Sequence, residues 1–288
     1  MKSDHLKWQP DELIVSAAAP VVRTLTELKL TKLTTFPRAG HLNSLCVKRF
    51  EHQWPGPKFV DQASLDSGEA RYYEQIIAQD GCIPTREDSW HDCFNACIWM
   101  QFPKTKHYLN ALHMQDINNF GVHPRTARRN HVTHFDECGV VLAIPRQHMN
   151  QGNEILQQLA THQWKQAMYH QRDLWQSVIF PFVFGHANLE MMLNPFIGLT
   201  GKWLAVLVDE NFENFTAFEQ TQHLDRVLLS RIQQLDDFIP ARLMPPLPIL
   251  GVPGWWSQQT ETFYDNTEYF RPQPKGKGPT PQLPLSLN

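Results

Sequence analysis

Apolar side chains recur at three- and four-residue intervals along several stretches of the chain, which is the spacing of one face of a helix. A helix is predicted over residues 90–101, because Asp88 or Ser89 can cap its start. Pro103 ends this helix and can open a second one that runs to about Asn118, so two helices joined by a sharp break are expected. The same spacing predicts helices over residues 70–78, 124–137, 154–175, 186–193 and 215–235.

Two uninterrupted apolar runs, residues 140–144 and 202–208, are typical of buried strands. A third apolar run, residues 177–184, is also predicted to be a strand, although Pro181 interrupts it. These runs are few and short beside the predicted helices. The expected fold class is therefore α+β, a helix-dominated single domain with a small buried sheet.

The distribution of proline and glycine divides the chain into four expected parts. Residues 1–69 mix short apolar stretches with prolines and should wrap the domain with one or two short helices, and residues 70–239 should form the core domain. Residues 240–272 contain PPLPILGVPGWW, which predicts an ordered, non-helical strap held by its two tryptophans. Residues 273–288 are expected to be a disordered tail, because proline, glycine and lysine leave little apolar surface to bury.

The composition indicates a globular protein with one sizeable core. Apolar residues make up 42% of the 288 positions, which excludes global disorder. The formal net charge of -3 creates no field that would attract nucleic acid, and the basic cluster of Arg125, Arg128 and Arg129 is too short to change this. Nucleic-acid binding is therefore not expected.

Three features indicate a soluble cytoplasmic protein without a membrane partner. The amino terminus lacks the apolar core of a signal peptide. The most apolar run, residues 178–184, is far shorter than the roughly 20 residues that cross a bilayer. The five cysteines are odd in number and widely spaced, so we expect reduced thiols rather than a disulfide framework.

Polar residues embedded in apolar elements are the candidates for chemistry. His91 and Asp92 open the helix predicted over residues 90–101, where the helix dipole favours an anionic Asp92 whatever its role. His91 and Asn95 are four residues apart and share a helical face beside an apolar stripe. Such a face can line a pocket, or it can satisfy a hydrogen-bond network in the core.

Two further groups of polar residues lie at predicted helix ends. Asp136 and Glu137 close a helix where the dipole disfavours negative charge, so a compensating group is expected. Arg129, two turns earlier on the same face, can form a structural pair with Asp136 or belong to a site. His186 and Glu190 are four residues apart at the start of a helix that follows a strand, a common position for binding groups. This pair can ligate a metal, or neutral His186 can donate a hydrogen bond to Glu190.

Four motifs follow one another between residues 90 and 272. The first is WHDCFNACIWMQFPKTKHYLN, residues 90–110. The second motif, residues 129–139, reads RNHVTHFDECG and is similar to the pattern Arg-Asp-x-x-Thr-x-Phe-Asp-Glu-x-Gly. It departs from this pattern at Asn130, where the pattern has Asp. The third motif, residues 184–190, reads FGHANLE and is similar to Phe-Gly-His-x-x-x-Glu. The last comprises LPILGVPGWW and FYDNTEYFRP. Together they resemble the bacterial family named domain of unknown function 3025, and the resemblance implies a bacterial cytoplasmic protein with no assigned activity.

Two functions remain open for these residues. The first is a hydrolase-like enzyme, with or without a metal, in which a histidine ligates the metal or acts as a base beside a carboxylate. The second is a non-catalytic binding or interaction domain with a buried polar network. The candidate catalytic residues are His91, Asp92, Asp136, Glu137, His186 and Glu190, and the candidate binding residues are Asn95, Asn110 and Arg129. A small molecule is a candidate partner, while the sequence specifies no cofactor, metal or oligomeric state.

The polar motif residues are expected to converge on one place. An isolated buried polar group costs on the order of 1–3 kcal/mol, and mutual contacts remove this cost. His91, Asp136, Glu137, His186 and Glu190 should therefore lie near one another although they are far apart in the sequence. An adjoining cleft would favour the enzyme, whereas a cluster sealed from solvent would favour the structural network.

Overall fold

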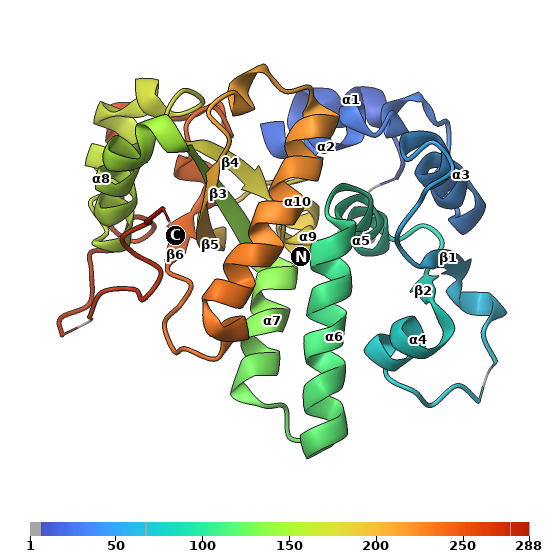
Figure 1. Cartoon of the computed structure of the whole chain (residues 1–288). Helices are drawn as coiled ribbons and strands as arrows, with labels where there is room; N and C mark the ends of the chain where they lie inside the picture. Colours follow the sequence, from blue (N-terminus) through green and yellow to red (C-terminus); the bar gives the residue numbers. More distant parts are fainter. Residues whose placement is uncertain (1–6, 67, 277, 288) are drawn as a thin grey trace.

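Helices dominate the computed structural model, which describes residues 7–66, 68–276 and 278–287 (Figure 1). The α-helices are α1 (Pro10–Ser16), α2 (Ala19–Glu27), α3 (Ala39–Arg49), α4 (Tyr73–Asp80), α5 (Trp90–Gln101), α6 (Pro103–Phe120), α7 (Ala127–Cys138), α8 (Met149–Ala160), α9 (His186–Met191) and α10 (Ala217–Gln234). The strands are β1 (Lys58–Asp61), β2 (Cys82–Thr85), β3 (Gly139–Pro145), β4 (Phe180–Val183), β5 (Thr200–Val208) and β6 (Pro246–Pro248). Short helical turns are η2 (Leu30–Lys32), η3 (Gln62–Ser64), η4 (Arg146–His148), η5 (Gln166–His170), η6 (Arg172–Leu174), η7 (Phe212–Asn214), η8 (Asp236–Phe238), η9 (Ile249–Gly251) and η10 (Glu261–Asp265). The expected helix-dominated α+β fold is confirmed, and none of the described helices is long and apolar enough to cross a membrane.

A four-stranded sheet in the order β4-β3-β5-β6 forms the centre of the fold. β3 and β5 pair in parallel, and the outer strands β4 and β6 run antiparallel to them. All of β3 is buried, and α7, α8 and α10 pack against the central pair (Figure 1). Pro181 lies in the edge strand β4, where the missing N–H of a proline is tolerated.

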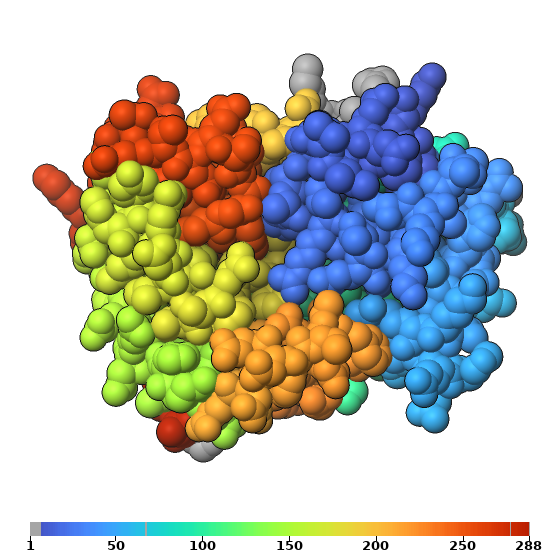
Figure 2. Space-filling model, turned by 90° about the horizontal axis from the view of Figure 1, so that it is seen from above, coloured from blue at the N-terminus to red at the C-terminus, as the bar shows by residue number. Residues whose placement is uncertain are grey.

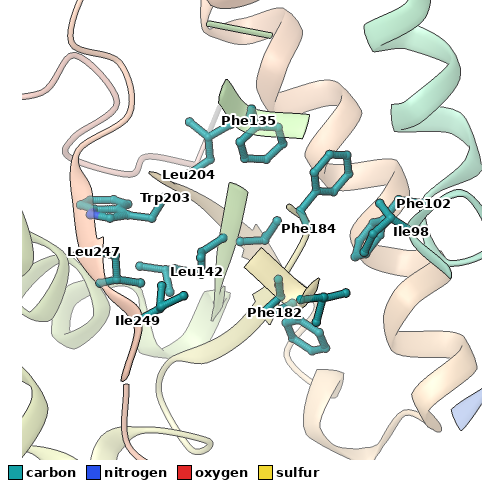
Figure 3. Packing of buried hydrophobic residues seen from close by; sticks show 14 of the residues in the cluster. Ile98, Phe102, Phe135, Leu142, Phe182, Phe184, Trp203, Leu204, Leu247 and Ile249 are labelled. Atoms are coloured by element: carbon teal, nitrogen blue, oxygen red, sulfur yellow. The ribbon is translucent and has the colours of Figure 1, made fainter. Parts of the chain in front are cut away.

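Buried aromatic rings connect the end of α5 to α7 and to the segment that follows β4. Figure 3 shows the Phe184 ring between those of Phe135 and Phe102. The rings of Phe135 and Phe184 stack with centroids 4.6 Å apart, and those of Phe102 and Phe184 are 5.2 Å apart. This packing holds three elements around a common point.

The turn between β4 and α9 lies directly against the end of α7. The carbonyl oxygen of Gly139 accepts hydrogen bonds from the N–H groups of Phe184 and Gly185. A Cβ atom on Gly185 would lie 2.4 Å from the carbonyl oxygen of Glu137, which is closer than any side chain can approach. Glycine is therefore required here, and the close approach places the start of α9 beside the end of α7.

Local signals explain the helix boundaries around this point. The Ser89 hydroxyl caps α5 by accepting from the Asp92 N–H, and Pro103 opens α6, so the predicted break between the two helices is confirmed. α7 begins three residues later than predicted. The reason is that the Thr126 side chain caps it by accepting from the Arg129 N–H.

The amino-terminal segment, residues 7–66, contains α1, α2 and α3 and packs over the central helices. The Trp8 ring stacks on Trp90 of α5 with centroids 4.9 Å apart, and the Ala18 N–H donates to the Met192 carbonyl after α9. Figure 2 shows these helices, in blue, lying against α10, in orange, where a hydrogen bond joins α3 to α10. β1 pairs in parallel with β2, so this segment contributes to a second, two-stranded sheet.

The carboxyl-terminal segment differs from our expectation of a disordered tail. Residues 273–276 and 278–287 are described, and the side chain of Gln282 is only 1% exposed. Its amide accepts from the Ala205 N–H and donates to the carbonyl oxygens of Trp203 and Leu243. One amide thus satisfies three backbone groups at and near β5, an interaction that amino-acid composition does not reveal.

Replacing Gln282 by alanine should lower the free energy of unfolding by about 3 kcal/mol, because buried backbone groups lose their partners. Urea denaturation measures this change. Lys275→Ala, at an exposed position in the same segment, is the control and should have little effect. A loss below about 0.5 kcal/mol for Gln282→Ala would show that the Gln282 amide does not bind the backbone of β5 in solution.

The proposed strap, residues 240–272, contributes β6 and several buried side chains. Leu247 and Ile249 are fully buried, and Trp255 is 6% exposed. Replacing Trp255 by alanine should lower the free energy of unfolding by about 3 kcal/mol, because a large apolar side chain leaves the core. Thermal and urea unfolding measure the effect, with the exposed Ser257→Ala as control. An effect below about 0.5 kcal/mol would instead support a flexible linker.

Candidate functional site

The five polar residues expected to converge lie together where α5, α7 and α9 meet. His91 is in the first turn of α5, Asp136 and Glu137 are in the last turn of α7, and His186 and Glu190 belong to α9. His91 Nδ1 lies 3.0 Å from Glu190 Oε2, and His91 Nε2 lies 3.1 Å from His186 Nε2. His186 Nε2 lies 3.7 Å from Glu137 Oε2, and His186 Nδ1 lies 3.7 Å from Asp136 Oδ2. We name these five residues the His/carboxylate cluster.

Burial and hydrogen bonding set the charges in this cluster. The His186 side chain is 5% exposed, and burial lowers its pKa to about 3, so the ring is neutral at pH 7. The hydrogen bond to Glu190 raises the pKa of His91, although burial opposes the shift. Burial also raises the pKa of Glu137. The cluster therefore combines a neutral imidazole with a carboxyl group that is costly to ionise without a nearby cation.

Lys106 of α6, which the sequence analysis did not single out, pairs with Asp136. Lys106 Nζ lies 2.5 Å from Asp136 Oδ1 and donates to Asn95 Oδ1 at 2.9 Å. Asn95 in turn donates to the Tyr73 hydroxyl. Burial disfavours the charge of Asp136, but the Lys106 ammonium, together with the neighbouring histidines, holds the pKa of Asp136 below its usual value. An ionised Asp136 is thereby fixed on the Nδ1 side of His186.

A pocket of about 140 Å³ adjoins the His/carboxylate cluster. Glu137 and His186 line it, and so do Asn110 and Glu74, whose carbonyl oxygen accepts from the Asn110 side chain. The side chains of His91 and Glu137 are 35% and 37% exposed, respectively, so solvent reaches the cluster. The cluster therefore lies beside an opening and is not sealed in the core.

Two other candidates make separate contacts. The Asp92 carboxylate accepts from the backbone N–H and the guanidinium of Arg86. Arg129 is fully buried, and its Nη1 donates to the Val122 carbonyl oxygen. The Arg129–Asp136 pair that we considered is absent from the described ion pairs, because Lys106 takes that place. The functional roles of Asp92, Arg129, Asn95 and Asn110 stay predictions.

The sequence contained one signal for Lys106, the residue that was missed. Lys106, Asn110 and His113 are spaced by four and three residues, which places them on one face of α6. All three are buried and line the same pocket. A charged or polar stripe at this spacing, on a helix within the first motif, indicates a pocket wall.

Comparison with known proteins gives a family match without an activity. A family model described as "Protein of unknown function (DUF3025)" matches residues 57–274, a range that includes α4 to α7 and α9. No curated protein and no solved structure matches the chain. The chemistry of the site must therefore be argued from its geometry.

Replacing Lys106 by methionine should lower the free energy of unfolding by about 2–4 kcal/mol, because Asp136 remains largely buried without its cation. The double variant with Asp136→Asn should recover part of the loss. Since the pKa of paired Asp136 is lowered, the ion pair contributes to the free energy of unfolding at neutral pH. This contribution is lost as the pH falls below about 4 and Asp136 becomes protonated. Urea denaturation at neutral and acid pH checks these expectations, and a loss at neutral pH below about 0.5 kcal/mol would contradict them.

Proposed function

The chain belongs to the DUF3025 family, and since the description of that family assigns no activity, we propose from the geometry of the site that the protein is a metal-dependent hydrolase. The ligands would be His91 Nε2, His186 Nε2 and Glu137 Oε2. One observation carries the proposal: these three residues offer ligand atoms that all lie within 4.8 Å of one another.

Each histidine has a carboxylate near the ring nitrogen that would not bind the metal. A ligating histidine usually donates its other ring N–H to a carboxylate, which orients the ring. His91 Nδ1 is within hydrogen-bond distance of Glu190 at 3.0 Å. His186 Nδ1 lies 3.7 Å from Asp136 Oδ2, which is too long for a hydrogen bond, and it has no other hydrogen-bond partner in the described chain. With protons on both Nδ1 atoms, the two Nε2 lone pairs point to the space that Glu137 also borders.

The ligand types and the adjoining pocket favour catalysis over a purely structural metal. Two imidazoles and one carboxylate form a ligand set of hydrolytic zinc enzymes, in which the fourth position stays open for water or substrate. A zinc ion in such a site supplies a water molecule of lowered pKa and polarises the bond to be cleaved. Glu190 orients His91, the Lys106–Asp136 pair places a carboxylate beside His186, and the pocket admits substrate beside these ligands.

A non-catalytic polar network is the competing interpretation. The pKa of His91 is raised, and a protonated His91 can donate from Nε2 to His186 Nε2, which would account for their 3.1 Å contact without a metal. The partial exposure of His91 and Glu137 and the adjoining pocket favour a binding site over such a network.

We also propose a bacterial cytoplasmic location, which rests on the family resemblance. All five cysteines are free, as expected in a reducing compartment. A small molecule is the partner class that the pocket suits, while the net charge of -3 argues against nucleic acid.

Untagged protein treated with a chelator should bind one Zn²⁺ per chain in a calorimetric titration, because its ligand groups are already in place. His186→Ala should abolish this binding, and Glu190→Gln should weaken it by about 10–100-fold. His134→Ala, an exposed histidine on α7, is the matched control. Zinc affinity that is equal in the wild type and His186→Ala would disprove the metal centre.

Zinc-loaded protein should hydrolyse at least one class of model substrate among esters, amides and phosphoesters. Chelation and His186→Ala should remove this activity, whereas His134→Ala should retain it. Zinc binding without turnover of any class would favour the non-catalytic binding domain.

A further inference from the structure

Other residues of the same pocket form a second polar pair that the His/carboxylate cluster does not include. Glu74 of α4 and His113 of α6 both line the pocket, with side chains 15% and 8% exposed. His113 Nδ1 lies 4.0 Å from Glu74 Oε1, which is too long for a hydrogen bond.

Both side chains have unused hydrogen-bonding atoms. Within the part of the chain that the structure describes, His113 Nδ1 and Glu74 Oε2 are buried and have no hydrogen-bond partner. Leaving such atoms unsatisfied destabilises the folded protein, because they lose the hydrogen bonds that they make with water. Because the two residues line a pocket, a ligand group placed between them could satisfy both.

The charges of the pair indicate a cationic ligand group. Burial lowers the pKa of His113, so its ring is neutral at pH 7. Arg125 also lines the pocket, but in the described ranges neither it nor any lysine forms an ion pair with Glu74, whereas the Asp136 carboxylate is paired with Lys106. A largely buried carboxylate without a cation is costly, and a positively charged ligand group removes that cost.

We propose that Glu74 and His113 bind a primary ammonium group of the substrate. An ammonium group can donate to Glu74 Oε2 and to His113 Nδ1 and also neutralises the carboxylate. A hydroxyl group has a single proton to donate and leaves the charge uncompensated. The rings of Tyr73 and Trp99 also line the pocket, and aromatic faces attract alkylammonium ions.

The size of the pocket restricts the substrate further. Its volume of about 140 Å³ is small beside the roughly 300–1,000 Å³ of sites for drug-sized ligands. This inference rests on the proposed function. The substrate is then a small molecule, or the end of a chain, that carries a primary amine. Its scissile bond lies near Glu137 and His186.

The test uses propylammonium chloride as the probe and the imidazole NMR signals of His113 in chelator-treated, full-length protein. Propylammonium should shift these signals in a saturable way, whereas propanol and propionate should not. Glu74→Gln, which keeps the shape of the side chain, should weaken binding by about tenfold or more, because a hydrogen bond to a charged group is lost. Glu213→Gln, at an exposed acidic position, is the control and should bind as the wild type does.

Three results would overturn the assignment: propanol binding as tightly as propylammonium, preferred binding of propionate, or no saturable shift of His113 in the folded protein. If Glu74→Gln does not fold, the comparison of the three probes on the wild type decides the matter. Because the protein is metal-free in this experiment, failure of zinc binding leaves the ammonium site intact, and failure of the ammonium site leaves the metal centre intact.

Discussion

The contact between Gly185 and the end of α7 sets the geometry on which the rest of the structure depends. Any Cβ atom at this position would lie 2.4 Å from the Glu137 carbonyl oxygen, so even alanine would push α9 away from α7. His186 follows directly in the sequence, and its ring would then move away from Glu137. The same contact keeps Phe184 stacked on Phe135. The same contact at Gly185 therefore determines both the packing of the core and the position of the His/carboxylate cluster.

Charge compensation determines what the site can hold. Lys106 neutralises Asp136, and Glu190 accepts from His91. The His186 ring 3.7 Å from Glu137 is neutral and gives it no charge compensation, and burial raises the pKa of Glu137. His91 and Lys106 offset only part of the cost of burying the Glu137 charge, and no lysine or arginine of the described chain forms an ion pair with Glu74. Both places become more stable when a cation enters.

Sequence reasoning succeeded where local interactions decide the outcome. The ends of α5 follow from the Ser89 cap and from Pro103, and the cluster was expected because its polar residues interrupt apolar motifs. Sequence reasoning failed where contacts between residues far apart in the chain determine the burial of a side chain. Lys106 is buried because α6 faces α7, and Gln282 is buried because one amide fits three backbone groups. Neither arrangement is encoded within a few residues of the side chain concerned.

Both ends of the described chain close onto its middle. The Ala18 N–H donates to the Met192 carbonyl oxygen, and the Gln282 side chain accepts from the Ala205 N–H. Contacts between such distant positions form only after long loops have closed against chain entropy. Helix-rich domains usually fold fast because their contacts are local. This chain should instead fold slowly for its helix content, and its two ends should dock last.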